Sequence, residues 1–134
     1  YFFDVGVVRA LSDSLRDPTD SLQKGYLFET AVLHELRTAA NYLNTGGVFC
    51  YWATPSGGEI DFIWKRGKKG IAFEVKASSE WKTQMGHNLK EFSSKFEKLY
   101  GVYLGDKTLQ DGPIQVYPFA VFVEQLYKNK ILSF

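Results

Sequence analysis

Three acidic residues and one lysine lie where the sequence otherwise reads as two apolar strands. Glu59 and Asp61 occupy alternate positions of the run EIDFIWKR, and Glu74 and Lys76 occupy alternate positions of the run GIAFEVKA. Side chains of a strand alternate between its two faces, so each run carries its charges opposite an apolar face. Carboxylates can hold a hard divalent cation, and a lysine beside them can stabilise charge that grows on a phosphate. These residue types therefore indicate metal-assisted hydrolysis of a phosphodiester.

The two runs are joined by the basic segment RGKK and are expected to form a hairpin. A two-residue loop at 67–68, where a leading glycine suits a type II′ turn, would place Asp61 opposite Glu74 and Glu59 opposite Lys76. A four-residue loop would instead place Asp61 opposite Lys76, with Glu74 one diagonal away. Opposed carboxylates repel each other unless a cation lies between them, and magnesium suits that position. Both registers keep the charged residues on one face of the hairpin.

A fourth acid is expected to reach the site from a helix. Apolar residues recur at helical spacing through 22–43, and Asn44 with two glycines follows. Glu29 borders the apolar stripe of this helix, which is the surface that should pack on the sheet. A glutamate at the edge of such a stripe is common, so Glu29 gains importance only together with the strand acids.

The remaining segments complete an α/β pattern, with helices packed on one mixed sheet. Ile60, Phe62 and Trp64 are expected to share the apolar face of their strand. The opening segment 1–11 is expected to hold a short strand and a helical turn, and 105–113 a loop. The expected order is α-β-β-β-α-β-β-α, with helices at 22–43, 88–99 and 118–126 and strands at 48–54, 59–66, 70–77, 100–104 and 114–117.

Composition and charge set limits on partners and location. The chain has a formal net charge of +1 and an isoelectric point near 8.0, too mild by itself to indicate nucleic-acid binding. Four cations gather at the predicted turn, either as a solvated hairpin tip or as a phosphate-facing patch: Lys65, Arg66, Lys68 and Lys69. No apolar run is long enough to cross a membrane, so no membrane partner and a cytoplasmic location are expected.

The single cysteine and the three tryptophans are interpreted as structural residues. Cys50 lies in the apolar run VFCYW and is expected to be buried. Trp52, Trp64 and Trp81 are interpreted as core or edge aromatics in preference to base-stacking platforms.

Several segments together resemble a known family. An acid on a helix, then D, then E-x-K on adjoining strands is similar to the PD-(D/E)XK nuclease superfamily, although isoleucine replaces the proline before Asp61. The segments YFFDVGVVRAL, GYLFETAVLHEL, YWATPSGGEIDFI and IAFEVKASS resemble more closely the uncharacterised, nuclease-like C-terminal domain of prokaryotic AAA+ ATPases. The similarity spans nearly the whole chain.

The resemblance implies a restriction-endonuclease-like core and a role for each acid. Asp61 and Glu74 would be ligands of Mg²⁺ or Mn²⁺. Glu59 is not part of the family motif; it shares the face of Asp61 and is expected either to bind the metal through water or to pair with Lys76. Lys76 would be the catalytic lysine, and Glu29 the acid on the helix.

The resemblance also implies partners. The substrate would be DNA, or alternatively RNA, with Lys82 and Gln84 in the loop after the third strand as further contacts beside the basic turn. Residues 1–134 would form a single domain, the C-terminal fragment of a longer ATPase chain, since no GxxxxGK[ST] phosphate loop occurs here. The alternative is a catalytically silent module that binds DNA or protein for the ATPase.

Overall fold

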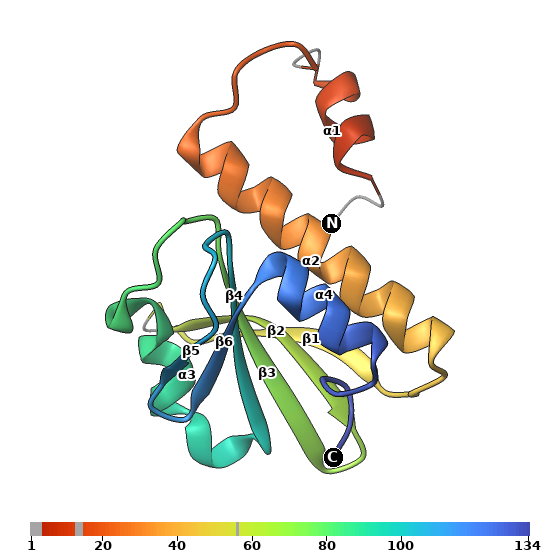
Figure 1. Cartoon of the computed structure of the whole chain (residues 1–134), viewed down its shortest axis with the longest axis vertical. Coiled ribbons are helices and arrows are strands. Elements are labelled where there is room, and N and C mark those ends of the chain that lie inside the picture. Colours follow the sequence, from red (N-terminus) through yellow and green to blue (C-terminus); the bar gives the residue numbers. More distant parts are fainter. Residues whose placement is uncertain (1–3, 13–14, 56) are drawn as a thin grey trace.

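The computed structural model describes residues 4–12, 15–55 and 57–134 and shows a mixed α/β fold (Figure 1). Six strands form one sheet in the order β1-β2-β3-β4-β6-β5. Strands β3, β4 and β6 are parallel, whereas β2 and β5 run antiparallel to their neighbours. The predicted class, a central mixed sheet flanked by helices, is confirmed.

Helices cover both faces of this sheet. The strands are β1 (Val48–Ala53), β2 (Glu59–Arg66), β3 (Lys69–Lys76), β4 (Lys98–Tyr103), β5 (Leu109–Asp111) and β6 (Ile114–Pro118). The helices are α1 (Val5–Leu11), α2 (Ser21–Tyr42), α3 (His87–Glu91) and α4 (Phe119–Tyr127), with 3₁₀ turns η1 (Thr83–Gly86) and η2 (Ser93–Lys95). One apolar cluster lies between the sheet and α2 with α4, and a second lies between the sheet and α3.

Helix α2 forms where the apolar spacing predicted it. The Asp20 side chain accepts a hydrogen bond from the backbone N–H of Gln23 at 2.7 Å, which satisfies one free donor of the first turn. Val32 and Leu36 are fully buried against the sheet. Asn44 follows the helix with a φ of 51°, a conformation that asparagine tolerates well.

The β2–β3 hairpin has the two-residue turn, one of the two registers that the sequence allowed. Arg66 pairs with Lys69, and Gly67 between them has a φ of 63°. The ladder ends at the pair formed by Phe62 and Phe73. Asp61 and Glu74 are therefore not cross-strand partners, and that detail of the predicted register is wrong.

A β-bulge interrupts β2 beside the ladder's end. Cys50 pairs with Ile63 and Trp52 with Ile60, so two residues of β2 lie opposite one residue of β1. The extra residue shifts the alternation of side chains by one position. Ile60 consequently packs in the α3 cluster with Ile63, whereas Phe62 packs in the α2 cluster. The prediction that Ile60 and Phe62 share a face is wrong for this reason.

The predicted helix at 88–99 is much shorter than expected. It ends at Glu91, and Lys98 begins β4. Two hydrogen bonds hold the chain extended before β4: the N–H of Glu97 donates to the carbonyl of Gly70 at 2.9 Å, and the N–H of Gly70 donates to Glu97 Oε2 at 2.6 Å. Pairing with β3 thus overrides the helical spacing of the apolar residues.

Two smaller expectations also change. The segment 105–113 contains strand β5, which pairs with β6 across a tight turn in which Gly112 has a φ of 59°. At the chain start, α1 begins after Asp4, whose side chain accepts from the N–H of Val7 at 2.9 Å. The strand expected in the opening segment falls partly on residues 1–3, outside the described residues.

Strand β1 lies at the edge of the sheet, and most of its side chains are exposed to solvent. Cys50 is exposed there, so the expectation that it is buried is wrong. A cavity of about 580 Å³ lies between β1 and the end of α2, with Arg37, Asn41 and Tyr51 in its lining. The strand acids do not line this cavity. Within the described ranges, none of the helices has the length and apolar character needed to cross a bilayer.

Candidate functional site

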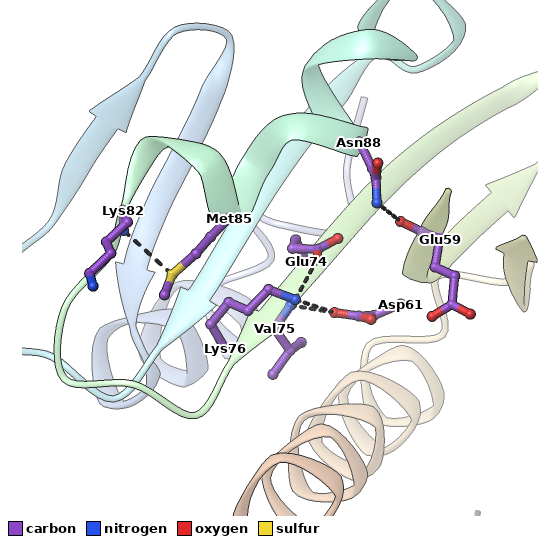
Figure 2. A network of polar contacts seen from close by, with 8 residues as sticks. All are labelled: Glu59, Asp61, Glu74, Val75, Lys76, Lys82, Met85 and Asn88. Carbon is purple, nitrogen blue, oxygen red and sulfur yellow. Dashed lines mark hydrogen bonds and ion pairs between the residues drawn. The ribbon is translucent and has the colours of Figure 1, made fainter. Parts of the chain in front are cut away.

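Three charged side chains converge at the carboxyl end of β3. Lys76 Nζ lies 2.5 Å from Glu74 Oε1 and 3.9 Å from Asp61 Oδ2. Figure 2 shows the two carboxylates approaching the same ammonium from neighbouring strands. Carboxyl ends of parallel strands are the usual place for ligand sites in open α/β sheets, and here β3 lies parallel to β4.

The end of the hairpin ladder positions Asp61. Its Oδ2 accepts a hydrogen bond at 2.7 Å from the backbone N–H of Val75, a residue beyond the last ladder pair of β3. The Asp61 carboxylate thus accepts from a backbone N–H of β3 that lies just beyond the end of the β2–β3 ladder. The bulge next to Asp61 helps to aim this side chain, as bulges beside functional sites commonly do.

The site is enclosed enough to alter the protonation of its members. Glu74 is only 5% exposed; burial raises the pKa of Glu74 to about 7, and the charge of Asp61 adds to the rise against the opposing effect of Lys76. Burial likewise raises the pKa of Asp61, although Lys76 and the N–H of Val75 pull it down. Burial disfavours the charged form of Lys76, but Glu74 and Asp61 outweigh this and raise its pKa.

One oxygen of Glu74 lacks a partner. Its Oε2 is buried and accepts no hydrogen bond from any described residue. Such an oxygen is costly unless it is protonated or meets a ligand. Two carboxylates suffice for magnesium, which often retains water and binds substrate phosphate for its other positions. The donor set therefore fits a hard divalent cation, although no group of three or more His, Cys, Asp or Glu among the described residues is arranged to hold a metal.

The charges of the other two acids also act on this centre. Glu29 on α2 is half-buried, and its charge acts on Glu74 and Lys76, raising the pKa of both. Glu59 is exposed, and its charge raises the pKa of Asp61. The carbonyl of Glu59 accepts a hydrogen bond from Asn88 Nδ2 at 2.9 Å, which ties the start of β2 to α3 (Figure 2).

A comparison with protein families assigns the chain. The profile of the family described as "Domain of unknown function (DUF4143)" matches residues 24–122. The chain belongs to this family. Neither the curated proteins nor the solved structures contain a significant match. The matched part of this DUF4143 domain includes all four acids and Lys76.

Sequence reasoning missed the apolar wall of the site. Gly101 of β4 is the register partner of Glu74, and a Cβ on Gly101 would lie 2.7 Å from the ring of Trp81. The indole ring therefore occupies the space beside Glu74 on the α3 face. Its Nε1 donates to Asp111 Oδ2 at 2.9 Å, and Asp111 also pairs with Lys90 at 2.6 Å. A glycine inside an apolar strand was the signal for this close approach.

The predicted nucleic-acid contacts are spread over the DUF4143 domain. The β2–β3 turn lies at the opposite end of β3 from Lys76. There Arg66 and Lys69 face the ring of Phe134, each at 5.2 Å from its centroid. Figure 2 shows Lys82 well to one side of the convergent carboxylates. Gln84, in η1, is exposed. The structure thus brings Asp61, Glu74 and Lys76 together, and leaves these cations apart from them.

Proposed function

We propose that this DUF4143 domain is a metal-dependent nuclease that hydrolyses phosphodiester bonds of DNA through a metal-activated water. The observation that carries the proposal is the buried, unpartnered Oε2 of Glu74 next to Asp61 and Lys76. A divalent cation held by Glu74 and Asp61 would remove the cost of that oxygen and the repulsion between the carboxylates. Half-buried Glu29 adds negative charge that favours a cation there.

Each residue has a distinct task in this proposal. Mg²⁺ or Mn²⁺, when bound, supplies a water of lowered pKa and a Lewis-acidic contact for a phosphate oxygen. Asp61 and Glu74 would hold the ion, and Glu59 would contribute through a bridging water from the exposed margin of the site. The Lys76 ammonium, one-third exposed, orients the attacking water and stabilises the negative charge that develops on the phosphate. Trp81 limits the access of bulk water to Glu74.

The resemblance to the PD-(D/E)XK superfamily supports the same assignment. It adds a restriction-endonuclease-like core, a DNA substrate and an N-terminal AAA+ ATPase region of the same polypeptide as partner, in the cytoplasm. The net charge of +1 is modest for a DNA enzyme, and an attached ATPase would supply further affinity for DNA. Sequencing of the full gene tests this part directly: an upstream reading frame without a phosphate loop would contradict it.

Metal binding tests the first step. Titration calorimetry with Mn²⁺ should show binding to the wild type and loss of binding in Asp61→Asn and Glu74→Gln. The exposed carboxylate of Glu80 serves as the matched control, so Glu80→Gln should bind as the wild type does. Equal binding by all four proteins would place the ion elsewhere and refute the site.

Cleavage tests the second step. Plasmid and single-stranded DNA incubated with Mn²⁺ should be cut by the wild type and by Lys24→Ala, an exposed lysine of α2. Lys76→Ala should lose this activity while retaining its fold by circular dichroism. Cleavage that persists in Lys76→Ala would assign the activity to a contaminant or to another site.

A second candidate is a catalytically silent module that binds DNA or protein for the ATPase. The contact of Lys76 with Glu74 favours it, because a lysine can neutralise a buried carboxylate without any metal. This candidate predicts no Mn²⁺ binding at millimolar concentration and DNA or ATPase binding that is unchanged in Lys76→Ala. Metal binding that depends on Asp61 would exclude it.

A further inference from the structure

A second, smaller cleft lies on the α3 side of the sheet. It has a volume of about 180 Å³ and lies between β1 and β2 on one side and the segment 92–96, which includes η2, on the other. Its lining includes Ile60, Ile63, Gly70 and Phe96. Gly70 has little room for a side chain, since a Cβ there would lie 3.2 Å from the Phe96 ring. The volume suits one planar ring and is too small for a whole drug-sized ligand.

Three lysines and no acidic residue line this cleft. Lys65, Lys68 and Lys95 are exposed at its rim, and the ion pairs among the described residues include none of them. Cations brought together without carboxylate partners create a local positive potential that attracts anions. The lining is therefore basic in a domain whose formal net charge is only +1, and the Glu97 carboxylate, bonded to the N–H of Gly70 behind the lining, offsets part of this charge.

Two aromatic rings supply the apolar part of the lining. Trp52 and Phe92 are both half-buried and meet edge to face with their centroids 4.2 Å apart. Lys95 Nζ lies over both rings, at 5.6 Å from Trp52 and 4.9 Å from Phe92. Cations around accessible aromatic rings are the combination with which proteins bind single-stranded nucleic acid, since phosphates contact the cations and bases stack on the rings; here the rings are half-buried and only part of each is accessible.

Strand alternation divides the basic turn between the two faces of the sheet. Lys65 and Lys68 line the cleft, whereas Arg66 and Lys69 lie on the opposite face against Phe134. The cations of the turn therefore do not act as one patch. Only the first pair can contribute to a ligand in the cleft.

We propose that this cleft binds a single-stranded segment of nucleic acid. One base packs against the accessible side of the Trp52–Phe92 pair, and the flanking phosphates contact Lys65, Lys68 and Lys95. The proposal rests on the proposed function for its choice of nucleic acid and specifies the substrate as single-stranded where it meets the domain. The cleft and the acidic centre share strand β2, since Ile60 lines the cleft and Asp61 follows it in the chain. A strand anchored here can continue toward Glu74 and Lys76.

The test measures binding without metal, so it does not depend on cleavage. Fluorescence anisotropy in EDTA follows labelled oligothymidylate and oligouridylate of about 12 nucleotides, within the site sizes of single-strand binders. A duplex of the same length and polyglutamate are the competing probes. Wild type should bind the single strands more tightly than the duplex, whose bases are stacked inside. The tighter of the two single strands identifies DNA or RNA as the source.

Two double variants with equal loss of charge separate the cleft from general electrostatics. Lys65→Gln/Lys68→Gln should weaken binding and reduce the slope of log K against log salt by about 1.4, that is, about 0.7 for each lost phosphate contact. Arg66→Gln/Lys69→Gln should leave the slope unchanged. Trp52→Leu should weaken binding about tenfold, in the range measured for loss of one base stack.

Several outcomes would overturn the inference. They are equal affinity for duplex and single strand, binding of polyglutamate as tight as that of the oligonucleotides, or equal effects of the two double variants. Lys24→Ala, at an exposed position of α2 outside the cleft lining, should bind as the wild type does. Binding that depends on the cleft, without any cleavage, would refute the proposed nuclease activity and support the proposed binding site. Cleavage without binding that depends on the cleft would support the nuclease activity and refute the binding site.

Discussion

Replacement of Glu74 by glutamine offers the sharpest physical test of the acidic centre. Glutamine has nearly the same shape but cannot ionise. Burial, followed by the charge of Asp61, raises the pKa of Glu74 from an ordinary 4.5 to about 7. A carboxyl with a raised pKa holds its proton more tightly in the folded state. Its contribution to stability is therefore fully present below pH 4.5 and is lost as the pH rises through 7.

The size of the expected stability change follows from the ordinary pKa of Glu74 and its raised pKa in the folded state. The interval from 4.5 to about 7 corresponds to about 3 kcal/mol, because each pH unit is worth about 1.4 kcal/mol. Urea unfolding of wild type and Glu74→Gln at several values between about pH 4 and about pH 8 gives the difference in free energy of unfolding directly. We expect wild type to lose about 3 kcal/mol relative to the variant across this range.

An exposed carboxyl provides the control. Glu80→Gln should follow the wild-type dependence, since Glu80 lies on an exposed loop. Parallel curves for wild type and Glu74→Gln would refute the reasoning, because Glu74 would then titrate alike in the folded and unfolded chains. If Glu74→Gln instead lost more stability than wild type as the pH rises, the pKa of Glu74 would be lowered in the folded state, and attraction by Lys76 would outweigh the effect of burial.

Further predictions concern the wall of the site and its metal. Gly101→Ala should cost about 1–3 kcal/mol in urea unfolding, because its Cβ meets the Trp81 ring. Gly25→Ala, with nothing within 4 Å, should instead stabilise α2 by about 0.5–1 kcal/mol; equal effects would contradict both. Asp111→Ala should lower the free energy of unfolding by about 1–3 kcal/mol in the same assay, since it leaves the Trp81 N–H without its acceptor. An unchanged urea midpoint would refute this prediction. The affinity for Mn²⁺, measured by calorimetry, should rise by up to about tenfold per pH unit until about pH 7 and then stay constant, because the ion must displace the proton of Glu74. An affinity that does not change with pH would contradict this prediction.

Local patterns in the sequence predicted the elements that hold the site. The helical spacing around Val32 and Leu36 identified α2, and the glycine that leads the β2–β3 turn gave one of the two registers considered, which proved correct down to Phe62 and Phe73. These features depend on near neighbours in the chain, so residue type and spacing carry them. The same-face placement of Glu74 and Lys76 follows from strand alternation for the same reason.

Long-range contacts decided the features that sequence reasoning missed. The extended stretch before β4 depends on two hydrogen bonds between Glu97 and Gly70, residues that lie far apart in the sequence. Trp81 beside Glu74 depends on an absent side chain at Gly101, in another strand. The hydrogen bond from the Val75 N–H to Asp61 depends on where the ladder stops, which no periodicity in the sequence encodes. Each needs the assembled sheet before it can be seen.

The bulge in β2 has a consequence for comparing relatives of this chain. Ile60 and Ile63 face the same layer only because an additional residue is accommodated between them. A homologue that lacks this residue would have a regular strand, and the acid equivalent to Asp61 would be shifted by one position in its sequence. A single-position gap in an alignment at 61–62 therefore marks a real change of backbone, and conservation of the acid should be scored only after that gap has been placed.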